Sequence, residues 1–381
     1  MKHHHHRLSI LLITGMTLSL LLTYCNTISE TPAATTDMTM TKIMLGRAIF
    51  MDTTLSNPPG QSCNSCHDLK TAMSDPNHAM ASPGIIKGRS EKRNAPSLHY
   101  IMFTPPLHYD SINETHVGGI FLDGRVNTLE EQVRVPLMNP LEMNVTDMNM
   151  LAEKIKSAPF YPLMSTVYGS SEHPDTLLAQ LADALAAFER SPEVNPFSSK
   201  FDLFLKGEVT LTEEEMEGLA LFKDTTKAMC ANCHPIDVDP MSGKVLLTDF
   251  TYDNVGSPKN LKLEFYSIPA PFNPDGVQFT DLGLGRVTGN AAQNGQFRVP
   301  TLRNVAVTAP YFHNGIFNTL EEVIHFYNVR DIDATFANPE VKENINVEEL
   351  GNLKLTQAEE QALVAFLKTL TDGYADNPSN Q

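Results

Sequence analysis

Apolar residues recur at helical spacing in several segments of this chain, and polar residues mark where those segments begin. In "LTEEEMEGLALF", Thr212 and Glu215 have the spacing of a helix capping box. The apolar positions that follow three or four residues apart are Met216, Leu219, Ala220 and Phe222. Similar runs are "KIMLGRAIFMDTTLS" near the start and "TQAEEQALVAFLKTL", which Thr356 and Glu359 open, near the end. Strand-like alternation is scarce, so the pattern predicts a mainly helical protein with long irregular loops.

One segment of this pattern occurs twice. The stretch "FLDGRVNTLEEQ" at 121–132 returns as "FHNGIFNTLEEV" at 312–323, and both copies carry the capping-box spacing Thr-Leu-Glu-Glu. The length of 381 residues exceeds what one hydrophobic core usually serves. We therefore predict two domains related by duplication, at 42–205 and 206–375. The alternative is that the two stretches are simply two capped helices.

The N-terminal pattern differs from the rest. Two basic residues and an apolar run from Leu8 to Leu22 lead to Cys25, which is typical of an export signal at 1–25 rather than a spanning helix. The residues before Cys25 resemble a lipoprotein cleavage box, although Tyr24 is bulky for that box, so a lipid anchor through Cys25 is one expectation. Residues 26–41 are rich in Thr, Ala, Ser and Pro and are expected to form a tether. These features predict a periplasmic protein.

Charge narrows the range of partners. With 28 Lys and Arg against 45 Asp and Glu, the formal net charge is −17. Nucleic-acid binding depends on clustered basic residues, so we expect no nucleic-acid partner. A strongly acidic protein would instead attract a basic one.

The other four cysteines form two C-x-x-C-H segments, the attachment motif of c-type haem. In that motif two thiols bind the haem vinyl groups and the adjacent histidine ligates the iron. A four-thiolate zinc site is the alternative, but it would leave both histidines unexplained. We predict two covalently bound haem c groups, with the first on Cys63, Cys66 and His67 and the second on Cys230, Cys233 and His234.

The offset of 191 residues aligns Tyr327 with Pro136. In the second copy Tyr327 shares a helix face with Leu320, Val323 and Ile324. In the first copy Pro136 is expected to interrupt the helix, and its side chain cannot bind iron. Tyr327 is therefore predicted to ligate the second haem iron, whereas the first haem has an open site.

Other ligands of the second haem stay open as alternatives. His313 and His325 compete with Tyr327, and Tyr327 could instead be a core aromatic over a five-coordinate haem. Ordinary methionine ligation is disfavoured, because all 17 methionines lie at or before Met241.

An open ferric haem beside a suitable acid and base can cleave peroxide. Gln132, where the second copy has Val323, could orient peroxide by hydrogen bonding. Glu142 in "NPLEM" could move a proton between the peroxide oxygens. Taken singly, each residue is better explained as an ordinary surface residue than as a catalyst, and it is their position around the repeat, beside Pro136, that favours a catalytic Glu142.

These segments resemble the bacterial di-haem cytochrome c peroxidase and MauG family. The resemblance covers nearly all of the expected mature chain, through "LGRAIFMDTTLS", "CNSCHDL", "RNAPSL", "FLDGRVNTLEEQ", "PLMNPLEM", "CANCH" and "VPTLRNVAVTAPYFHNG". It implies two c-type haem domains and peroxidatic roles for Gln132 and Glu142. It also implies a calcium ion between the domains, held by the Asn94 side chain and the carbonyls of Thr308 and Pro310.

Departures from the family pattern place the chain nearer the MauG-like branch. Classical members carry a histidine that ligates the first haem until reduction releases it, and Ile86 stands at that place, with His78 elsewhere on the loop. Tyr327 matches the MauG-like tyrosine ligand.

Leu122 is a departure of another kind, because it stands where members usually have a tryptophan between the haems. This puts the path of electrons between the haems in doubt.

We therefore expect an exported di-haem peroxidase that reduces hydrogen peroxide at the first haem with electrons relayed through the second. The electrons would come from a small cytochrome, a copper protein or side chains of a partner protein. The alternatives are a MauG-like oxidase of a partner protein and a pure electron-transfer cytochrome.

Overall fold

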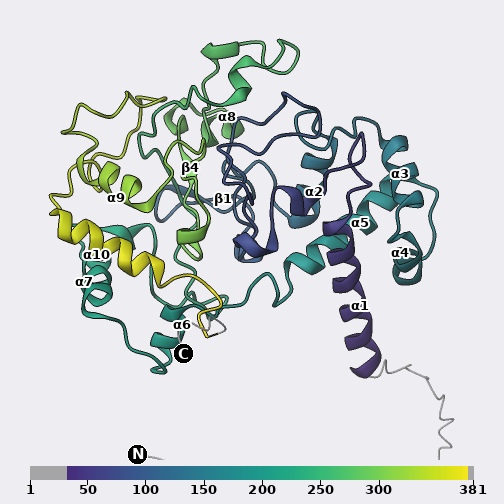
Figure 1. Ribbon diagram of the computed structural model, residues 1–381, viewed down its shortest axis with the longest axis horizontal. Helices are drawn as coiled ribbons and strands as arrows, with labels where there is room; N and C mark the ends of the chain where they lie inside the picture. The colour runs from purple at the N-terminus through teal and green to yellow at the C-terminus, as the bar shows by residue number, and fades with distance from the viewer. Residues whose placement is uncertain (1–31, 376–381) are drawn as a thin grey trace, which may run out of the picture.

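The computed structural model describes residues 32–375, and within them helices far outweigh strands (Figure 1). The prediction of a mainly helical fold with long irregular loops is confirmed. The helices are α1 (Pro32–Met51), α2 (Leu129–Met138), α3 (Met148–Ser157), α4 (Tyr161–Tyr168), α5 (Pro174–Glu189), α6 (Lys200–Leu205), α7 (Glu213–Lys223), α8 (Leu284–Thr288), α9 (Leu320–Val329) and α10 (Gln357–Lys368). The strands are β1 (His108–Asp110), β2 (Thr115–Val117), β3 (Tyr252–Asp253) and β4 (Phe297–Arg298).

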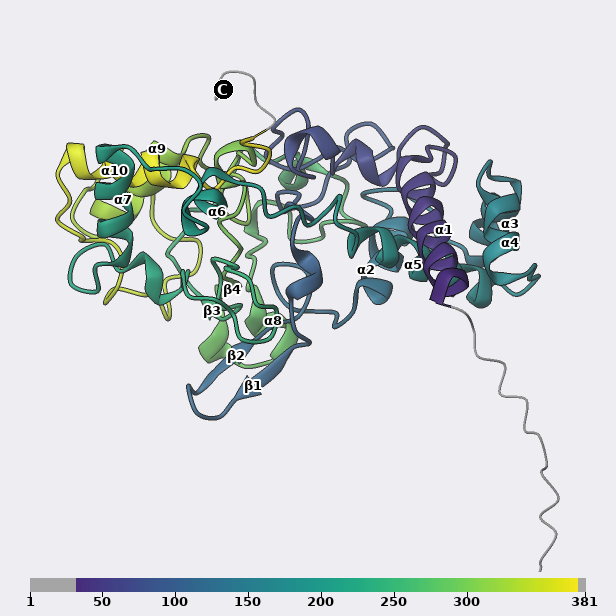
Figure 2. The ribbon, with the colours of Figure 1, turned by 90° about the horizontal axis from the view of Figure 1, so that it is seen from below.

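The helices gather into two lobes. In Figure 1, α1 to α5 lie on one side and α6, α7, α9 and α10 on the other. One hydrophobic core runs from Leu45 to Val194 and a second from Phe201 to Leu370. The two short antiparallel sheets, β1 with β2 and β3 with β4, lie between the lobes, and Figure 2 shows the β1–β2 hairpin projecting from one edge.

Each lobe is built on one close helix crossing, and the two crossings match. A Cβ atom added to Gly46 of α1 would lie 1.9 Å from the carbonyl oxygen of Ala184 in α5. One added to Gly218 of α7 would lie 1.9 Å from the carbonyl oxygen of Ala362 in α10. The aromatic pairs beside the crossings also correspond: Phe50 with Phe188, and Phe222 with Phe366. This agreement of two crossings, down to single atoms, is what duplication predicts.

The repeated segment folds alike in both lobes. Helices α2 and α9 have the same length at an offset of 191 residues, and Thr128 and Thr319 cap them with the same backbone φ of −131°. The predicted capping box is complete in α9. In α2 the Glu131 carboxylate instead accepts a hydrogen bond from the Asn127 backbone N–H at 2.9 Å.

The expected interruption of the first helix by Pro136 is wrong, because α2 continues through Pro136 to Met138. A proline in the last turn of a short helix removes only one backbone hydrogen bond. The two copies therefore differ in the side chain at this position and not in the length of the helix.

Two further expectations need correction. Helix α1 begins at Pro32, inside the expected tether at 26–41, since proline suits the first helical position. In α7 the capping box at Thr212 is confirmed, but Met216 is 43% exposed and Ala220 is also exposed. Gly218 and Leu221 are buried in their place, because the crossing with α10 draws the Gly218 side of the helix inward.

The expected export signal at 1–25, with Cys25, lies outside the described residues. Within 32–375, no helix is both long and apolar enough to cross a bilayer.

Buried ion pairs connect the lobes. The Arg93 guanidinium contacts the carboxylates of Asp123 and Asp281, each at 2.7 Å. The next residue, Asn94, donates its backbone N–H to the His313 carbonyl at 2.7 Å. These contacts join the segment after the first C-x-x-C-H motif to the second lobe, so they fix the two lobes against each other.

Replacing Gly218 by alanine is expected to lower the free energy of unfolding by about 1–3 kcal/mol, because the new methyl group meets backbone rather than a movable side chain. Guanidinium chloride unfolding of the haem-loaded protein measures this change. Glu217→Ala adds the same residue at the neighbouring exposed position and should stay within about 0.5 kcal/mol of the parent protein. Equal stabilities for the two variants would contradict the close crossing.

Candidate functional site

Both C-x-x-C-H motifs lie on single tight turns. The first begins with the 3₁₀ turn η1 (Cys63–Ser65) and the second with η4 (Cys230–Asn232). The His67 backbone N–H donates to the Cys63 carbonyl at 3.0 Å, and the His234 N–H donates to the Cys230 carbonyl at 2.9 Å. The two thiols and the imidazole of each motif therefore come from one compact turn.

The motif histidines are held in one orientation. Nδ1–H of His67 donates to the Met73 carbonyl at 3.1 Å, and Nδ1–H of His234 donates to the Leu247 carbonyl at 2.9 Å. Both acceptor residues have left-handed backbone, with φ of 55° and 56°. Burial lowers the pKa of both rings, to about 4 for His234. A neutral imidazole with Nδ1–H engaged leaves the Nε2 lone pair free for iron, as a proximal ligand requires.

The four motif cysteines form no disulfide bond within residues 32–375, so each is available to bond a haem vinyl group. Burial raises their pKa to about 12 for Cys63, Cys230 and Cys233 and to about 11 for Cys66. Within residues 32–375, Cys233, Asp253 and Glu349 form the one cluster of three or more side chains that could together bind a metal ion. The four thiols do not meet, so the alternative of a four-thiolate zinc site is wrong.

A continuous cavity of about 450 Å³ joins the two motifs. Besides the motif cysteines and histidines, it is lined by every other residue predicted for the site: Asn94, Gln132, Glu142, Thr308, Pro310 and Tyr327. Leu122 and Pro136 also line it. Three residues considered in the sequence analysis, Ile86, His78 and His325, do not line the cavity.

The repeated helices α2 and α9 present the same positions to this cavity. Gln132 and Pro136 line it from α2, and Val323 and Tyr327 line it from α9. In the first lobe the cavity is therefore faced by the amide of Gln132 and by Pro136, whose side chain has no atom that could bind iron. In the second lobe the matching positions are the apolar Val323 and the phenol of Tyr327.

The histidines that compete with Tyr327 lie in other surroundings. His325 is 49% exposed, and its Nδ1 lies 3.0 Å from a carboxylate oxygen of Glu360. His313 lines the cavity but stacks on the Phe297 ring with centroids 3.8 Å apart. Tyr327 packs with the second core, and no described residue hydrogen-bonds its hydroxyl. Burial, followed by the Asp253 charge, raises the pKa of this phenol above its ordinary value.

The carboxyl group of Glu142 is a much weaker acid than an ordinary glutamate. Burial raises its pKa to about 7, and the negative charge of Glu91 adds to the rise. Its Oε2 accepts a hydrogen bond from Nδ2 of Asn139 at 2.8 Å. A carboxyl group that titrates near neutral pH can both take up and release a proton.

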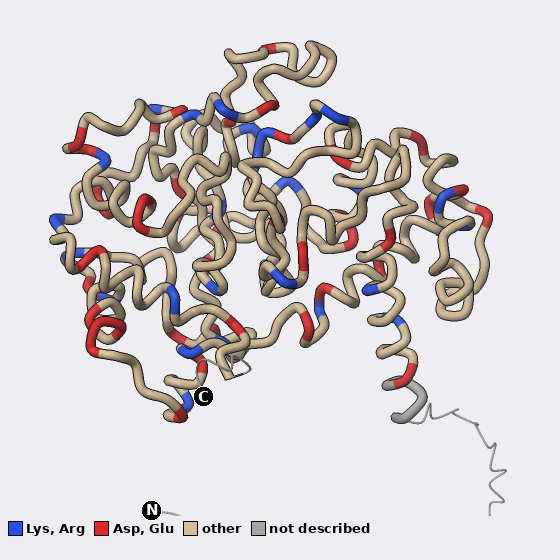
Figure 3. The backbone as a smooth tube through the Cα atoms, viewed as in Figure 1, with Lys and Arg blue, Asp and Glu red and all other residues tan. Residues whose placement is uncertain are grey.

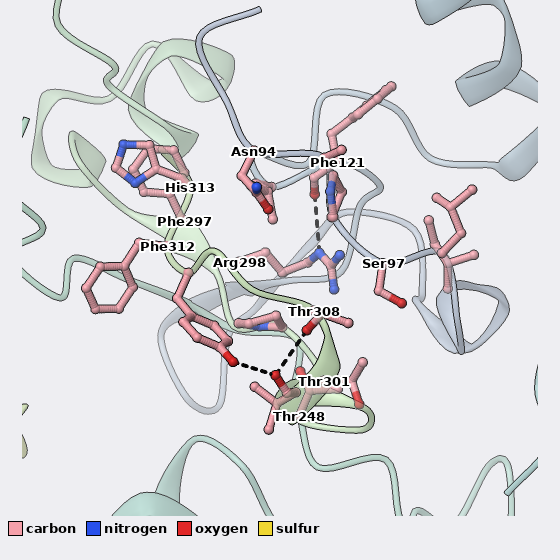
Figure 4. Close-up of a pocket in the computed structure, with 18 of the residues that line it drawn as sticks. Asn94, Ser97, Phe121, Thr248, Phe297, Arg298, Thr301, Thr308, Phe312 and His313 are labelled. Carbon is pink, nitrogen blue, oxygen red and sulfur yellow. Dashed lines mark hydrogen bonds between the residues drawn. The ribbon is translucent and has the colours of Figure 1, made fainter. Parts of the chain in front are cut away.

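Arg298 is the cavity residue that best tests whether haem fits. Its guanidinium extends into the middle of the pocket between Asn94 and Thr308 (Figure 4), and its Nε donates to the Phe121 carbonyl at 3.4 Å. Burial lowers its pKa, and no carboxylate of residues 32–375 pairs with it. An enclosed cation needs an anionic partner. The propionates of haem would supply one, so the cavity suits haem in charge as well as in the placement of thiols and imidazoles.

Several polar residues of the cavity were not predicted from the sequence. Among them are Arg298, His99 and Glu189. Nδ1 of His99 accepts a hydrogen bond from the Asn304 amide at 3.0 Å, and burial raises the pKa of Glu189 to about 8. No motif or regular spacing in the sequence marks these residues, because each reaches the cavity from a separate segment of the chain.

Two matched helix crossings, each with a C-x-x-C-H turn at a shared cavity, define a di-haem c-type cytochrome. A family model described as di-haem cytochrome c peroxidase matches residues 40–210. The chain is 34% identical over 349 residues to methylamine utilization protein MauG of Paracoccus denitrificans, which covers 86% of this chain and 88% of that protein. It is 32% identical over 335 residues to cytochrome c551 peroxidase of Nitrosomonas europaea, covering 87% and 80%.

Among solved structures, the diheme peroxidase BthA from Burkholderia thailandensis superposes with a TM-score of 0.78 at 33% identity. The match covers 87% of this chain and 86% of that one. The chain belongs to the di-haem cytochrome c peroxidase and MauG family. Its members are oxidoreductases with two covalently bound haem c groups and are typically periplasmic. The predicted family, fold and peroxidase-type activity are confirmed.

Proposed function

We propose that this enzyme reduces hydrogen peroxide at the haem of Cys63, Cys66 and His67, with electrons relayed through the haem of Cys230, Cys233 and His234. The observation that carries this division of labour is the difference between the lobes at matched cavity positions. Gln132 and Pro136 face the cavity where the second lobe has Val323 and Tyr327. The N-terminal domain at 42–205 would be peroxidatic and the C-terminal domain at 206–375 would transfer electrons.

Haem c supplies, when bound, an iron that takes up peroxide and exchanges electrons with a donor. Reduction of one peroxide to two waters consumes two protons and two electrons, so the protein must manage protons. The ionised Glu142 carboxylate can take a proton from one peroxide oxygen and return it to the other as water leaves. The Gln132 amide can hold the peroxide by a hydrogen bond while this occurs. Pro136 offers no atom that would compete for the iron.

Tyr327 would ligate the second haem iron through its phenol oxygen. This role is supported by its place on the cavity face of α9 and by its hydroxyl, which has no hydrogen-bond partner among residues 32–375. A phenolate donates charge and stabilises oxidised iron, which suits a low-potential relay.

A calcium ion would lie between the lobes. Asn94, Thr308 and Pro310 line one cavity, and Nδ2 of Asn94 donates to the Ala79 carbonyl at 3.1 Å, which leaves Oδ1 as a ligand. Calcium takes six to eight oxygens, so water would complete such a site.

The electron donor would be a small cytochrome or a copper protein, acting in the periplasm. Acidic residues outnumber basic ones and the two kinds are interspersed over the described backbone (Figure 3), which supports a basic partner. A lipid anchor through Cys25 would keep the enzyme at the membrane.

A second candidate function is oxidation of a partner protein. The sequence similarity to MauG and the tyrosine at position 327 support it. In both candidates Leu122 lines the cavity that joins the two motifs, and its carbonyl accepts the Arg298 backbone N–H at 2.8 Å.

The rate constant for reaction with peroxide is expected to rise with pH through about 7, because Glu142 acts as a base only when ionised. Glu142→Gln should slow the reaction by about 10²–10⁴-fold and remove this pH dependence. Stopped-flow absorption of the haems measures both effects. The proposed role fails if the variant reacts as fast as the parent.

Tyr327→Phe is expected to convert the second haem from six-coordinate low-spin to high-spin iron, because the variant lacks the ligand oxygen. Electron paramagnetic resonance of the oxidised protein measures the spin state. Tyr311→Phe is the matched control, since Tyr311 lines the cavity but donates its hydroxyl to the Val305 carbonyl at 2.9 Å. An unchanged spectrum in Tyr327→Phe would exclude tyrosine ligation.

A further inference from the structure

One amide group at the edge of the cavity holds two carboxyl groups from different segments. Asn139 follows the end of α2, and its Nδ2 donates to Glu142 at 2.8 Å and to Glu91 at 2.6 Å. The Oδ1 atom of the same side chain accepts the Leu141 backbone N–H at 2.9 Å. That third bond fixes which end of the amide faces the acids, so both N–H bonds of Nδ2 are directed at carboxylate oxygens.

The two carboxyl groups have unequal surroundings. Glu91 lies beside Lys92, whose ammonium is 3.4 Å from its other carboxylate oxygen, and its side chain is 24% exposed. Burial by itself raises the pKa of Glu91, but the Lys92 charge and the Asn139 amide outweigh burial and hold that pKa below its ordinary value. Glu91 therefore carries the negative charge of the pair.

The charge on Glu91 acts directly on Glu142. Two carboxylates that share one amide donor repel each other, so the second is harder to ionise. The other charged groups that bear on Glu142 are Lys92 and Arg125, and both favour its ionised form. Arg89 approaches the same turn but donates to the Pro140 carbonyl at 3.2 Å. Glu91 is the negative group among these neighbours.

The pair occurs in one lobe only. At the offset of 191 residues the second lobe has Arg330 in place of Asn139 and Asp333 in place of Glu142. Arg330 donates to the Val255 carbonyl and pairs with Asp331, so it bridges no such acids. The arrangement belongs to the lobe proposed to react with peroxide and is no part of the duplicated scaffold.

We propose that Glu91 is a positioning residue of the peroxide site, whose carboxylate, fixed by Asn139, sets the pH at which Glu142 exchanges its proton. The proposal rests on the proposed function for the use that Glu142 makes of that proton. The contact between the two acids stands independently of it. The charge on Glu91 thereby brings the proton exchange of Glu142 close to neutral pH, where the Glu142 carboxyl group can both accept and donate a proton.

The test is Glu91→Gln in the haem-loaded protein, which keeps a hydrogen-bond acceptor for Asn139 and removes the charge. Two pH titrations are recorded: the rate constant for reaction with peroxide, and the infrared carbonyl stretch of protonated Glu142, identified by its loss in Glu142→Gln. Both midpoints should fall by about one pH unit in Glu91→Gln. Asn139→Ala should move them upward, because the ionised Glu142 loses a donor. Glu130→Gln, a charge change on the exposed side of α2, should leave them unchanged.

The outcomes separate the two proposals. An infrared midpoint that stays at the parent value in Glu91→Gln overturns the role of Glu91, whatever the kinetics show. A peroxide reaction that is unaffected in Glu142→Gln overturns the catalytic role of Glu142, while the infrared titration still reports whether the two acids are coupled. Glu91→Gln decides the question even if Asn139→Ala fails to fold.

Discussion

The hydrogen bond from Nδ1 of each motif histidine to a backbone carbonyl is the contact on which the two sites depend. It fixes the imidazole as a neutral ring with its other nitrogen turned to the cavity. The acceptor carbonyls belong to Met73 and Leu247, which hold left-handed backbone that few residues with side chains adopt. The loops after both motifs are shaped to deliver these carbonyls, and the remainder of each lobe supports that shape.

Around this shared contact, duplication has kept the scaffold and changed the cavity wall. Gly46 and Gly218 allow the same close helix crossing, and α2 and α9 keep the same length and the same capping threonine. The differences are side chains that face the cavity, above all Pro136 against Tyr327. On the proposed function, two haems in one chain would take different tasks without any change of fold, because the residues that would hold each haem are matched and the other cavity residues differ.

Sequence predicted what is local and periodic. The capping boxes at Thr212 and Thr356, the two C-x-x-C-H turns and the offset between the repeated segments all follow from spacing along the chain. The effect of Pro136 was mistaken because the loss of one N–H donor does not end a helix whose Val133 and Leu137 pack in the first core. Arg298 and the bridge from Glu91 through Asn139 to Glu142 carry no spacing signal, because tertiary packing alone brings their segments together.

The central claim is that the first haem is open to peroxide in the oxidised protein, since neither Ile86 nor His78 reaches the cavity and Pro136 cannot bind iron. The most direct measurement mixes hydrogen peroxide with the fully oxidised protein and, separately, with protein first reduced by one electron. Comparable rate constants in the two experiments are the predicted result. A protein that reacts only after reduction would contradict the account, because some group would then have to block the iron until it is reduced.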